Sequence, residues 1–356
     1  MVPTAPDEDA AIERAARQRR TFTDKTVTLA HGAGGKSSAA LIDAVFIPAF
    51  GQPDPDELAD AALLASPGAR LAFSTDSYVV NPIQFPGGSI GDLAVNGTVN
   101  DLSVSGARPL WLSAAFVIEE GLDVATLREI VADMAAAAAR AGVSIVTGDT
   151  KVVPKGAADR LFITTSGIGV VPDGRHLGAK LVQPGDRVLL SGSIADHGMA
   201  VMLARGDLAI GAQIASDTAP LNAAVDALLA AAPGTRWMRD ATRGGLGTVT
   251  NELAQATGGA IVLDDDALPV KPQVRGACDM LGIDPLYVAN EGCFVAIVPD
   301  AQADAALAAL RDAGCPDAAL VGEILPEPHG VVAVRNAFGG ARLVDMLMGD
   351  PLPRIC

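Results

Sequence analysis

The stretch LWLSAAFV at residues 110–117 is followed by the helical pattern VATLREIVADMAAAAARA at 124–141 and by the short apolar run VSIV at 143–146. The first and third segments have the length and composition of buried strands, and the second has the length and periodicity of a helix. A strand, a helix and a second strand in this order form one unit of an α/β sheet. The segment therefore predicts an α/β (α+β) fold.

Similar elements are expected on both sides of this unit. Towards the N-terminus we expect a strand at 26–30, a glycine-rich loop at 31–37, a helix at 38–46, a strand at 71–74 and a helix at 90–106. Towards the C-terminus we expect strands at 160–171, 187–192, 260–263, 293–298 and 331–334, and helices at 197–205, 221–231 and 245–257. No short repeat is visible, which excludes a solenoid or a propeller.

The length of 356 residues predicts two domains, at ~100–200 residues per domain. The turn residues Pro184-Gly185-Asp186 place the boundary near 172–184. The expected division is a flexible N-terminal extension at 1–25, a first domain at 26–172, a second domain at 184–348 and a flexible tail at 349–356.

Composition excludes several classes of protein. A net charge of −16 disfavours nucleic-acid and anionic-membrane partners, which need a basic surface. Four cysteines lie far apart without a Cys-x-x-Cys pair, so neither a zinc site nor a disulfide framework is indicated. No signal peptide is visible, and the most apolar helical stretch contains Arg140 and is shorter than the ~20 residues of a membrane span. We expect a cytoplasmic protein.

Four aspartates lie next to expected strand ends or glycine turns: Asp76, Asp101, Asp149 and Asp240. Carboxylates at the carboxyl ends of strands are ligands that magnesium prefers, and magnesium implies phosphate. Together they suggest a nucleotide–metal site, although for any one of them alone a helix cap or a turn is the better explanation.

The loop at 32–36 contains Gly34, Gly35 and Lys36 ahead of an expected helix. Its amide groups and the Lys36 ammonium could bind an anion. It fits neither the Walker pattern nor the dinucleotide-binding pattern, and a simple turn explains it as well.

The chain ends in the cysteine Cys356, preceded by Pro351 and Pro353. The prolines favour an extended tail, whose eight residues at ~3.1 Å each would reach roughly 25 Å. Such a tail could enter an active site, or it could be an idle terminus. A prenylation box is excluded because its cysteine stands fourth from the end.

Lys151 and Glu291 are candidates for proton transfer, with a surface ion pair as the alternative. Ordinary structural or surface roles are expected for the histidines His31, His197 and His329. Buried, inert thiols are expected at Cys278, Cys293 and Cys315.

Several segments, taken together, resemble the HypE family of hydrogenase maturation proteins. They are LAHGAGGK at 29–36, TDSYVV at 75–80, FPGG at 85–88, GTVNDL at 97–102, GDTK at 148–151, RDATRGG at 239–245 and PRIC at 353–356. The resemblance runs from about Val27 to Cys356. HypE proteins belong to the superfamily of ATP-using enzymes that includes aminoimidazole ribonucleotide synthetase, thiamine monophosphate kinase and selenophosphate synthetase.

The resemblance implies a two-domain aminoimidazole-ribonucleotide-synthetase-like fold and a homodimer formed by the N-terminal domains through a β-barrel-like interface. It also implies a reaction that supplies the cyanide ligands of [NiFe]-hydrogenase. The partner HypF would load a carbamoyl group onto the C-terminal thiol, and ATP would drive dehydration of the thiocarboxamide to a thiocyanate. The cyano group would then pass to iron on the HypC–HypD complex.

The resemblance also implies roles for residues of this chain. Cys356 would carry the reacting group, and Lys151 and Glu291 would accept protons. The ligands implied for Mg²⁺ are Asp76, Asp101, Asp149 and Asp240, and those implied for ATP are Gly34, Gly35, Lys36, Asp76, Asn100, Asp101 and Asp149.

Two other hypotheses stay open on the sequence. One is another synthetase of the same superfamily, although the absence of a cysteine before Cys278 disfavours a selenophosphate enzyme. The other is a non-catalytic carrier of a one-carbon group on Cys356. The sequence assigns no function to the N-terminal extension, and Cys293 beside Glu291 is treated as incidental.

Overall fold

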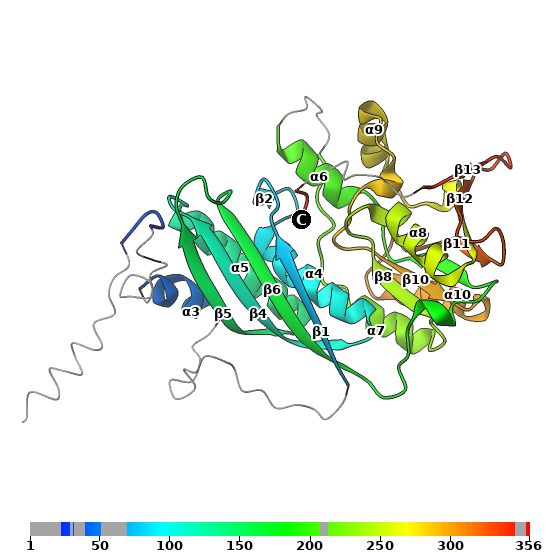
Figure 1. Ribbon diagram of the computed structural model, residues 1–356, viewed down its shortest axis with the longest axis horizontal. Helices are drawn as coiled ribbons and strands as arrows, with labels where there is room; N and C mark the ends of the chain where they lie inside the picture. The colour runs from blue at the N-terminus through cyan, green and yellow to red at the C-terminus, as the bar shows by residue number, and fades with distance from the viewer. Residues whose placement is uncertain (1–22, 29–30, 32–39, 51–69, 207–212, 346–353) are drawn as a thin grey trace, which may run out of the picture.

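The computed structural model describes residues 23–28, 31, 40–50, 70–206, 213–345 and 354–356. Figure 1 shows two large sheets with their helices, and the C-terminus lies between them. The glycine-rich loop at 32–36 and the prolines of the tail lie outside the described residues.

The first sheet has the strand order β1-β6-β4-β5 over the described residues. Its strands are β1 (Arg70–Tyr78), β4 (Arg108–Glu119), β5 (Ser144–Val153) and β6 (Leu161–Val171). Strands β4 and β5 run parallel, joined by helix α5 (Val124–Ala141), and the other pairs are antiparallel. This confirms the predicted strand–helix–strand unit. Helix α5 begins at its cap Asp123 and ends at Gly142, whose φ of 68° suits glycine.

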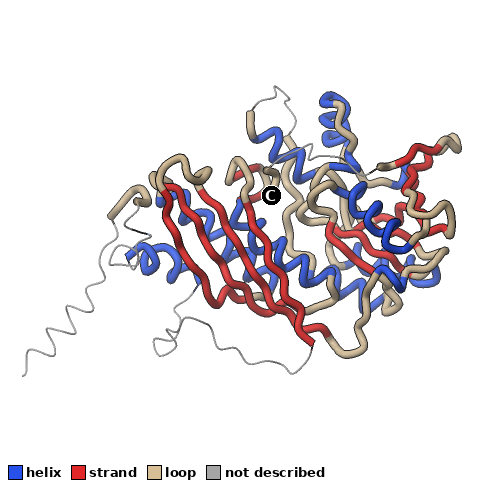
Figure 2. The backbone as a smooth tube through the Cα atoms, viewed as in Figure 1, coloured by secondary structure: helices blue, strands red, loops and turns tan. Residues whose placement is uncertain are grey.

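Helices α4 (Ile90–Val104) and α5 cover one face of this sheet, as Figure 2 shows. Strand β6 accordingly alternates buried and half-buried side chains along its length. The other face is left open, with Phe73 69% exposed and Leu71 53% exposed on β1.

Shorter elements complete this half: η2 (Ile42–Phe46), α3 (Ile47–Phe50), β2 (Gln84–Phe85) and β3 (Gly88–Ser89). The strand expected at 26–30 forms only a single bridge, Thr26 with Asp123, among its described residues.

The second sheet has the strand order β13-β12-β9-β11-β7-β10-β8 in the described part of the chain. Its strands are β7 (Arg187–Leu190), β8 (Trp237–Asp240), β9 (Ala260–Asp264), β10 (Phe294–Val298), β11 (Ala319–Leu325), β12 (Val332–Arg335) and β13 (Ala341–Leu343). Strands β9 and β12 are parallel, and the remaining pairs are antiparallel.

The helices of this half are α6 (Asp196–Ala204), α7 (Asn222–Ala231), α8 (Gly245–Thr257), α9 (Pro272–Leu281) and α10 (Asp300–Asp312). Short 3₁₀ turns lie at η4 (Ala179–Leu181), η5 (Asp265–Ala267) and η6 (Pro285–Tyr287). Alternate residues of β10 pack into two separate cores, Val295 with α8 and Phe294 with α7 and α10. The sheet is therefore sandwiched between helical layers. Within the described ranges, no helix is long and apolar enough to cross a membrane.

Candidate active site between the two sheets

Helix α4 lies where the two halves meet, because it packs on β1 and β6 and also touches β8 and α7. Gly97 lets β1 approach closely, since a Cβ there would lie 2.2 Å from the Tyr78 hydroxyl. The close approach also brings the next turn of α4 to β1, where the Ser74 hydroxyl donates to the Asp101 carboxylate at 2.6 Å.

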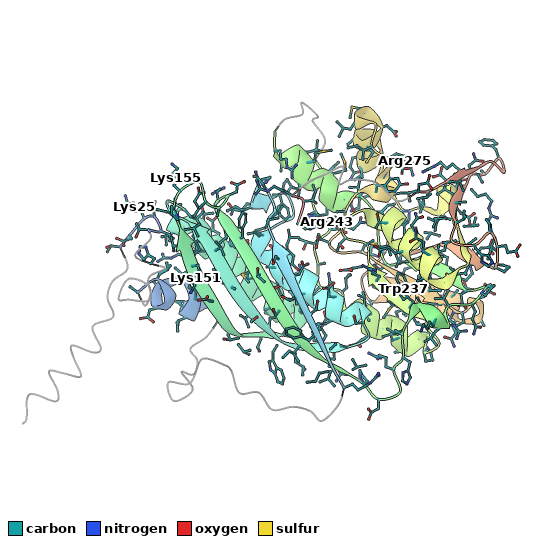
Figure 3. The ribbon with its side chains drawn as sticks, in the orientation of Figure 1. Lys25, Lys151, Lys155, Trp237, Arg243 and Arg275 are labelled. Atoms are coloured by element: carbon teal, nitrogen blue, oxygen red, sulfur yellow. The ribbon has the colours of Figure 1, made fainter. Side chains whose placement is uncertain are left out.

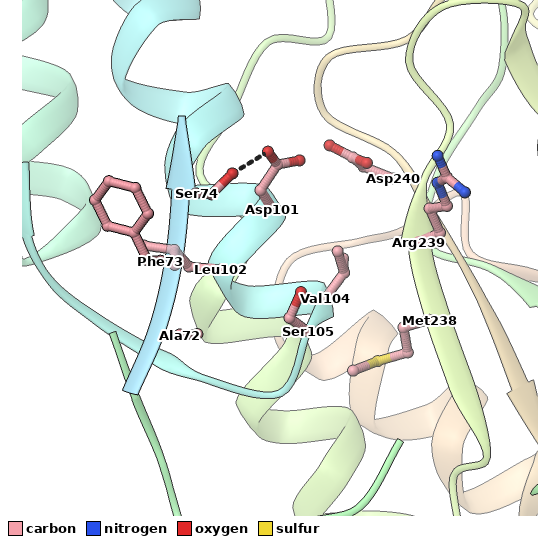
Figure 4. Close-up of a pocket in the computed structure, with 10 residues that line it drawn as sticks. All are labelled: Ala72, Phe73, Ser74, Asp101, Leu102, Val104, Ser105, Met238, Arg239 and Asp240. Atoms are coloured by element: carbon pink, nitrogen blue, oxygen red, sulfur yellow. Dashed lines mark hydrogen bonds between the residues drawn. The ribbon is translucent and has the colours of Figure 1, made fainter. Parts of the chain in front are cut away.

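A pocket of about 250 Å³ opens between β1, α4 and β8. Ser74, Asp101, Arg239 and Asp240 contribute its polar lining. Figure 4 shows the carboxylates of Asp101 and Asp240 pointing towards each other across it. The end of strand β8 and the last turn of helix α4 thus supply acids to the same space.

Burial raises the pKa of several carboxyl groups at this site. Burial, and next the Asp101 carboxylate, raise the pKa of Asp240 to about 7. Burial also raises the pKa of Asp101, while the Ser74 hydrogen bond opposes that rise and Asp76 adds to it. The pKa of Glu291 lies well above its usual value because of burial, and then because of Asp240 and further acids. The site has more negative charge than its own cations neutralise.

A magnesium ion bound with a nucleotide fits this donor set. Mg²⁺ in phosphate sites takes one or two carboxylates and completes its shell with phosphate oxygens and water. Among the residues that the structure describes, no group of three acids, histidines or cysteines could hold a metal ion by itself. The carboxylates suit a metal that arrives with phosphates.

The end of the chain lies at the same place. The Val79 amide donates to the Cys356 carbonyl at 3.2 Å, and the Asn81 amide donates to Arg354 at 3.3 Å. Burial, and next the Glu291 carboxylate, raise the pKa of the Cys356 thiol to about 12. The Arg243 side chain lies 3.6 Å from the Cys356 sulfur, and its positive charge opposes this rise. The structure therefore brings Cys356, Glu291 and Asp76 together.

The loop that carries Glu291 is held by the half-buried acid Asp217. One Asp217 oxygen accepts the amide hydrogen of Glu291 and the other accepts that of Gly292, both at 3.0 Å. Gly292 has no room for a side chain, since a Cβ would lie 1.8 Å from the Asp217 carbonyl oxygen. Burial raises the pKa of Asp217 to about 6.

Asn100 also positions this loop. Its side-chain amide donates to the carbonyls of Glu291 and Ala219 and accepts from the Leu221 amide. The side chain is buried, and these contacts are all with backbone. The ATP-binding role expected for Asn100 stays a prediction.

Asp149 and Lys151 lie elsewhere in the single chain. They form an exposed ion pair at 3.0 Å on β5, at the opposite edge of the sheet from β1. Figure 3 shows Lys151 away from Arg243, whose side chain lies 3.6 Å from the Cys356 sulfur. Their neighbours on β4 are Ala115 and Val117, which point to the open face.

The expectation that Asp149 follows a strand end is wrong. Strand β5 continues through it to Val153. Gly148, which suggested a turn, lies within the strand. A glycine occupies this position because the β4 backbone passes too close for a side chain. A Cβ there would lie 2.2 Å from the Ala114 carbonyl oxygen.

Other expectations have mixed outcomes. Cys278 and Cys293 are buried as expected, whereas Cys315 is only half-buried because it follows the end of α10. Gly34, Gly35 and Lys36 lie outside the described residues.

Sequence patterns did not single out Asp217, whose partners stand 74 and 75 residues further along the chain.

Comparisons with known proteins match nearly the whole chain. The model of the AIR synthase related protein N-terminal domain matches residues 58–171, and that of the C-terminal domain matches 183–335. Carbamoyl dehydratase HypE of Rhodobacter capsulatus is 56% identical over 340 residues, 94% of this chain and 99% of that protein. Its namesake from Escherichia coli K12 is 46% identical over 336 residues, 93% of this chain and 99% of that protein.

Solved structures of HypE proteins resemble this chain over most of its length. A crystal structure of hydrogenase maturation protein HypE in complex with ATP superposes with a TM-score of 0.88 at 46% identity, covering 93% of this chain and 100% of the other. A crystal structure of a HypE–HypF complex gives a TM-score of 0.76 at 46% identity, covering 86% of this chain and 100% of the other.

Proposed function

The chain belongs to the HypE carbamoyl dehydratases of the AIR synthase related family, and we propose that it dehydrates a carbamoyl group carried on its own Cys356. It is an ATP-dependent enzyme of hydrogenase maturation. The observation that carries the proposal is the place of the Cys356 thiol, beside Arg243 and within electrostatic reach of Glu291 and Asp76.

The proposed reaction turns the thiocarboxamide into a thiocyanate. The carbamoyl oxygen attacks the γ-phosphorus of ATP, so that a C–O–P linkage forms and ADP leaves. Two protons then leave the nitrogen, the C–O bond breaks and the oxygen departs as phosphate. The products are S–C≡N on Cys356, ADP and phosphate, so the lost water is accounted for by ATP hydrolysis.

Residues of this chain supply the proton and charge chemistry. Glu291 is the proposed proton acceptor because it lies within electrostatic reach of the Cys356 thiol, and burial raises its pKa above the usual range of a carboxyl group. Arg243 lies beside the sulfur, where it neutralises charge that develops on the carbamoyl oxygen. Asp76, Asp101 and Asp240 would hold Mg²⁺, which neutralises the phosphate charges when bound.

We further propose that the enzyme is a homodimer formed through the open face of the first sheet. Phe73, Ile168 and Trp111 lie side by side across three strands on that face. An apolar row of this kind fits a second copy of the same surface. Asp149 and Lys151 stand on the same face, so each chain would offer them to the site of its partner. The β-barrel-like form of this interface is part of the proposal.

Two partners follow from the proposed chemistry. HypF as the carbamoyl donor is supported by the HypE–HypF crystal structure among the relatives. The HypC–HypD complex is proposed as the acceptor of the cyano group. The alternative as a purine or selenophosphate enzyme is set aside because relatives at 46–56% identity are carbamoyl dehydratases. The same relatives set aside a carrier without activity.

A single-turnover mass measurement tests the proposal. Protein carbamoylated on Cys356 is mixed with ATP and Mg²⁺, and the C-terminal peptide is expected to lose the mass of one water. The matched control, Glu291→Gln, keeps the size of the side chain but removes the base, and we expect it to retain the carbamoyl mass. An unchanged mass in the wild-type protein would refute the proposed reaction.

A further inference from the structure

Both halves of the molecule hold the last three residues of the chain. On the first half, the amides of Val79 and Asn81 bind the tail backbone, and the Arg354 side chain pairs with Asp159 at 2.7 Å. On the second half, the Arg205 side chain donates to the Arg354 carbonyl at 2.8 Å. The docked tail therefore bridges the two halves.

His197 makes the most enclosed of these contacts. It is the second residue of α6, has no exposed surface, and places Nε2 2.9 Å from the Ile355 carbonyl oxygen. A carbonyl oxygen only accepts hydrogen bonds, so Nε2 carries the hydrogen. The other nitrogen, Nδ1, lies 2.8 Å from the Ser216 hydroxyl and must then accept from it.

Ser216 is itself fixed in place. Its amide donates to the Pro86 carbonyl at 2.8 Å, and its hydroxyl oxygen accepts from the Thr218 amide at 3.1 Å. The His197 ring also packs edge-on against Phe85, with ring centroids 5.5 Å apart. Because the Ser216 oxygen already accepts the Thr218 amide, its hydroxyl hydrogen is available to donate to Nδ1 of His197. This contact favours the tautomer in which Nε2 carries the hydrogen and donates to the tail.

The Ser216 hydrogen bond therefore fixes the tautomer of the imidazole, which is neutral at neutral pH because burial lowers the pKa of His197 to about 4. Ile355, whose carbonyl it binds, is only 4% exposed and belongs to the core of the first half. Cys356 is the next residue, so fixing Ile355 fixes the starting point of the reacting side chain.

We propose that His197, oriented by Ser216, is the positioning residue that docks the tail through the Ile355 carbonyl and so sets the Cys356 sulfur in the site. His197 touches no reacting atom and acts through the tail. The consequence for catalysis rests on the proposed function, whereas the docking itself does not.

Alkylation of the full-length protein by iodoacetamide tests the docking without ATP or a carbamoyl group. The rate at Cys356 is followed by peptide mass spectrometry, with the buried Cys293 as internal standard. His197→Leu leaves the Ile355 carbonyl unpaired, and we expect Cys356 to react about tenfold faster. His197→Gln keeps an N–H donor and should stay closer to the wild-type rate. The exposed His329→Leu is the matched control and should change nothing.

A Cys356 rate in His197→Leu equal to that of the wild type would overturn the proposal. If Cys293 also becomes reactive in that variant, Ser216→Ala decides, since it removes only a hydroxyl. We expect it to expose Cys356 a few-fold and to leave Cys293 slow, and an unchanged Cys356 rate would overturn the proposal equally.

A kinetic measurement separates positioning from general damage. In single turnovers of the carbamoylated protein, His197→Leu should slow the dehydration by a factor similar to its alkylation effect, with the KM for ATP unchanged. A raised KM for ATP with an unchanged rate at saturation would contradict it. If no variant or wild type dehydrates the tail, the proposed reaction is wrong, while the alkylation result still stands.

Discussion

The Asp217 carboxylate binds the backbone of Glu291 and not the Glu291 side chain. The two Asp217 oxygens accept hydrogen bonds from the amides of Glu291 and Gly292, at 3.0 Å each. The Glu291 side chain is thereby left to the acidic site, although its loop is fixed. Burial raises the pKa of Asp217 to about 6, so the clamp is held at an energetic cost at neutral pH.

That cost predicts a pH dependence of stability. The folded pKa lies above the unfolded value of about 3.8, so the folded state binds the extra proton between these values. The contribution of Asp217 to stability is thus greatest below pH 4 and falls as pH rises through 6, by roughly 3 kcal/mol. In urea unfolding, the stability of the wild type relative to Asp217→Asn should fall by about 2 kcal/mol between pH 4.5 and pH 7, which is the part of the change that lies in this interval. A constant difference between the two proteins would contradict the shift.

The contact between Gly97 and Tyr78 predicts that alanine at position 97 destabilises the protein, although alanine normally stabilises a helix relative to glycine. Alanine normally stabilises a helix interior by about 0.5–1 kcal/mol relative to glycine. Here Gly97→Ala should destabilise by about 1–3 kcal/mol, because its Cβ would lie 2.2 Å from the Tyr78 hydroxyl.

Tyr78→Phe is the partner variant, since it removes the clashing oxygen and leaves Cζ at 3.1 Å. In the Tyr78→Phe background, Gly97→Ala should cost much less. A double-mutant cycle of unfolding free energies measures this coupling, and additive effects would show that the hydroxyl is not the obstacle.

Arg243 gives a prediction on rate. It is the cation that opposes the rise in the pKa of Cys356 and lies 3.6 Å from its sulfur. Arg243→Met keeps the length and removes the charge, and we expect dehydration to slow by about 10²-fold. Arg335→Met, which breaks an exposed pair with Asp264, is the control and should keep the wild-type rate. Equal rates for both variants would remove Arg243 from the mechanism.

The proposed dimer predicts complementation between two inactive variants. If Lys151 serves the site of the partner, Lys151→Ala and Glu291→Ala are each inactive alone but form a mixed dimer with one intact site. Random mixing should restore about a quarter of wild-type activity, because half of the dimers are mixed and each has one working site. No recovery after subunit exchange would place both residues in the site of one chain.

Local patterns predicted the elements that carry their own signals. The expected span of α5 agrees with the structure because Asp123 and Gly142 cap it, and that of α8 because it lies between Gly244 and Gly258. The strand predicted at 143–146 is shorter than β5, because Gly148 lies within the strand, close to the β4 backbone, and does not form a turn. Helix α10 gave no clear expectation, since its apolar positions are mostly alanine.

In the candidate site too, residues with a local sequence signal were predicted and residues that act through distant contacts were not. Asp101, Asp240, Glu291 and Cys356 were each singled out from the sequence, and the structure brings them together. Asp217 and His197 act through contacts across 74 and 158 residues. No local pattern carries such a contact, so a structural or surface role was the natural expectation for His197.

The central claim is that the carbamoyl oxygen leaves Cys356 as part of phosphate. The most direct measurement uses a carbamoyl group labelled with ¹⁸O in one single turnover with ATP and Mg²⁺, followed by mass analysis of the phosphate released. The account predicts one labelled oxygen in each phosphate formed and a thiocyanate on Cys356. Label found in water, with unlabelled phosphate, would contradict it.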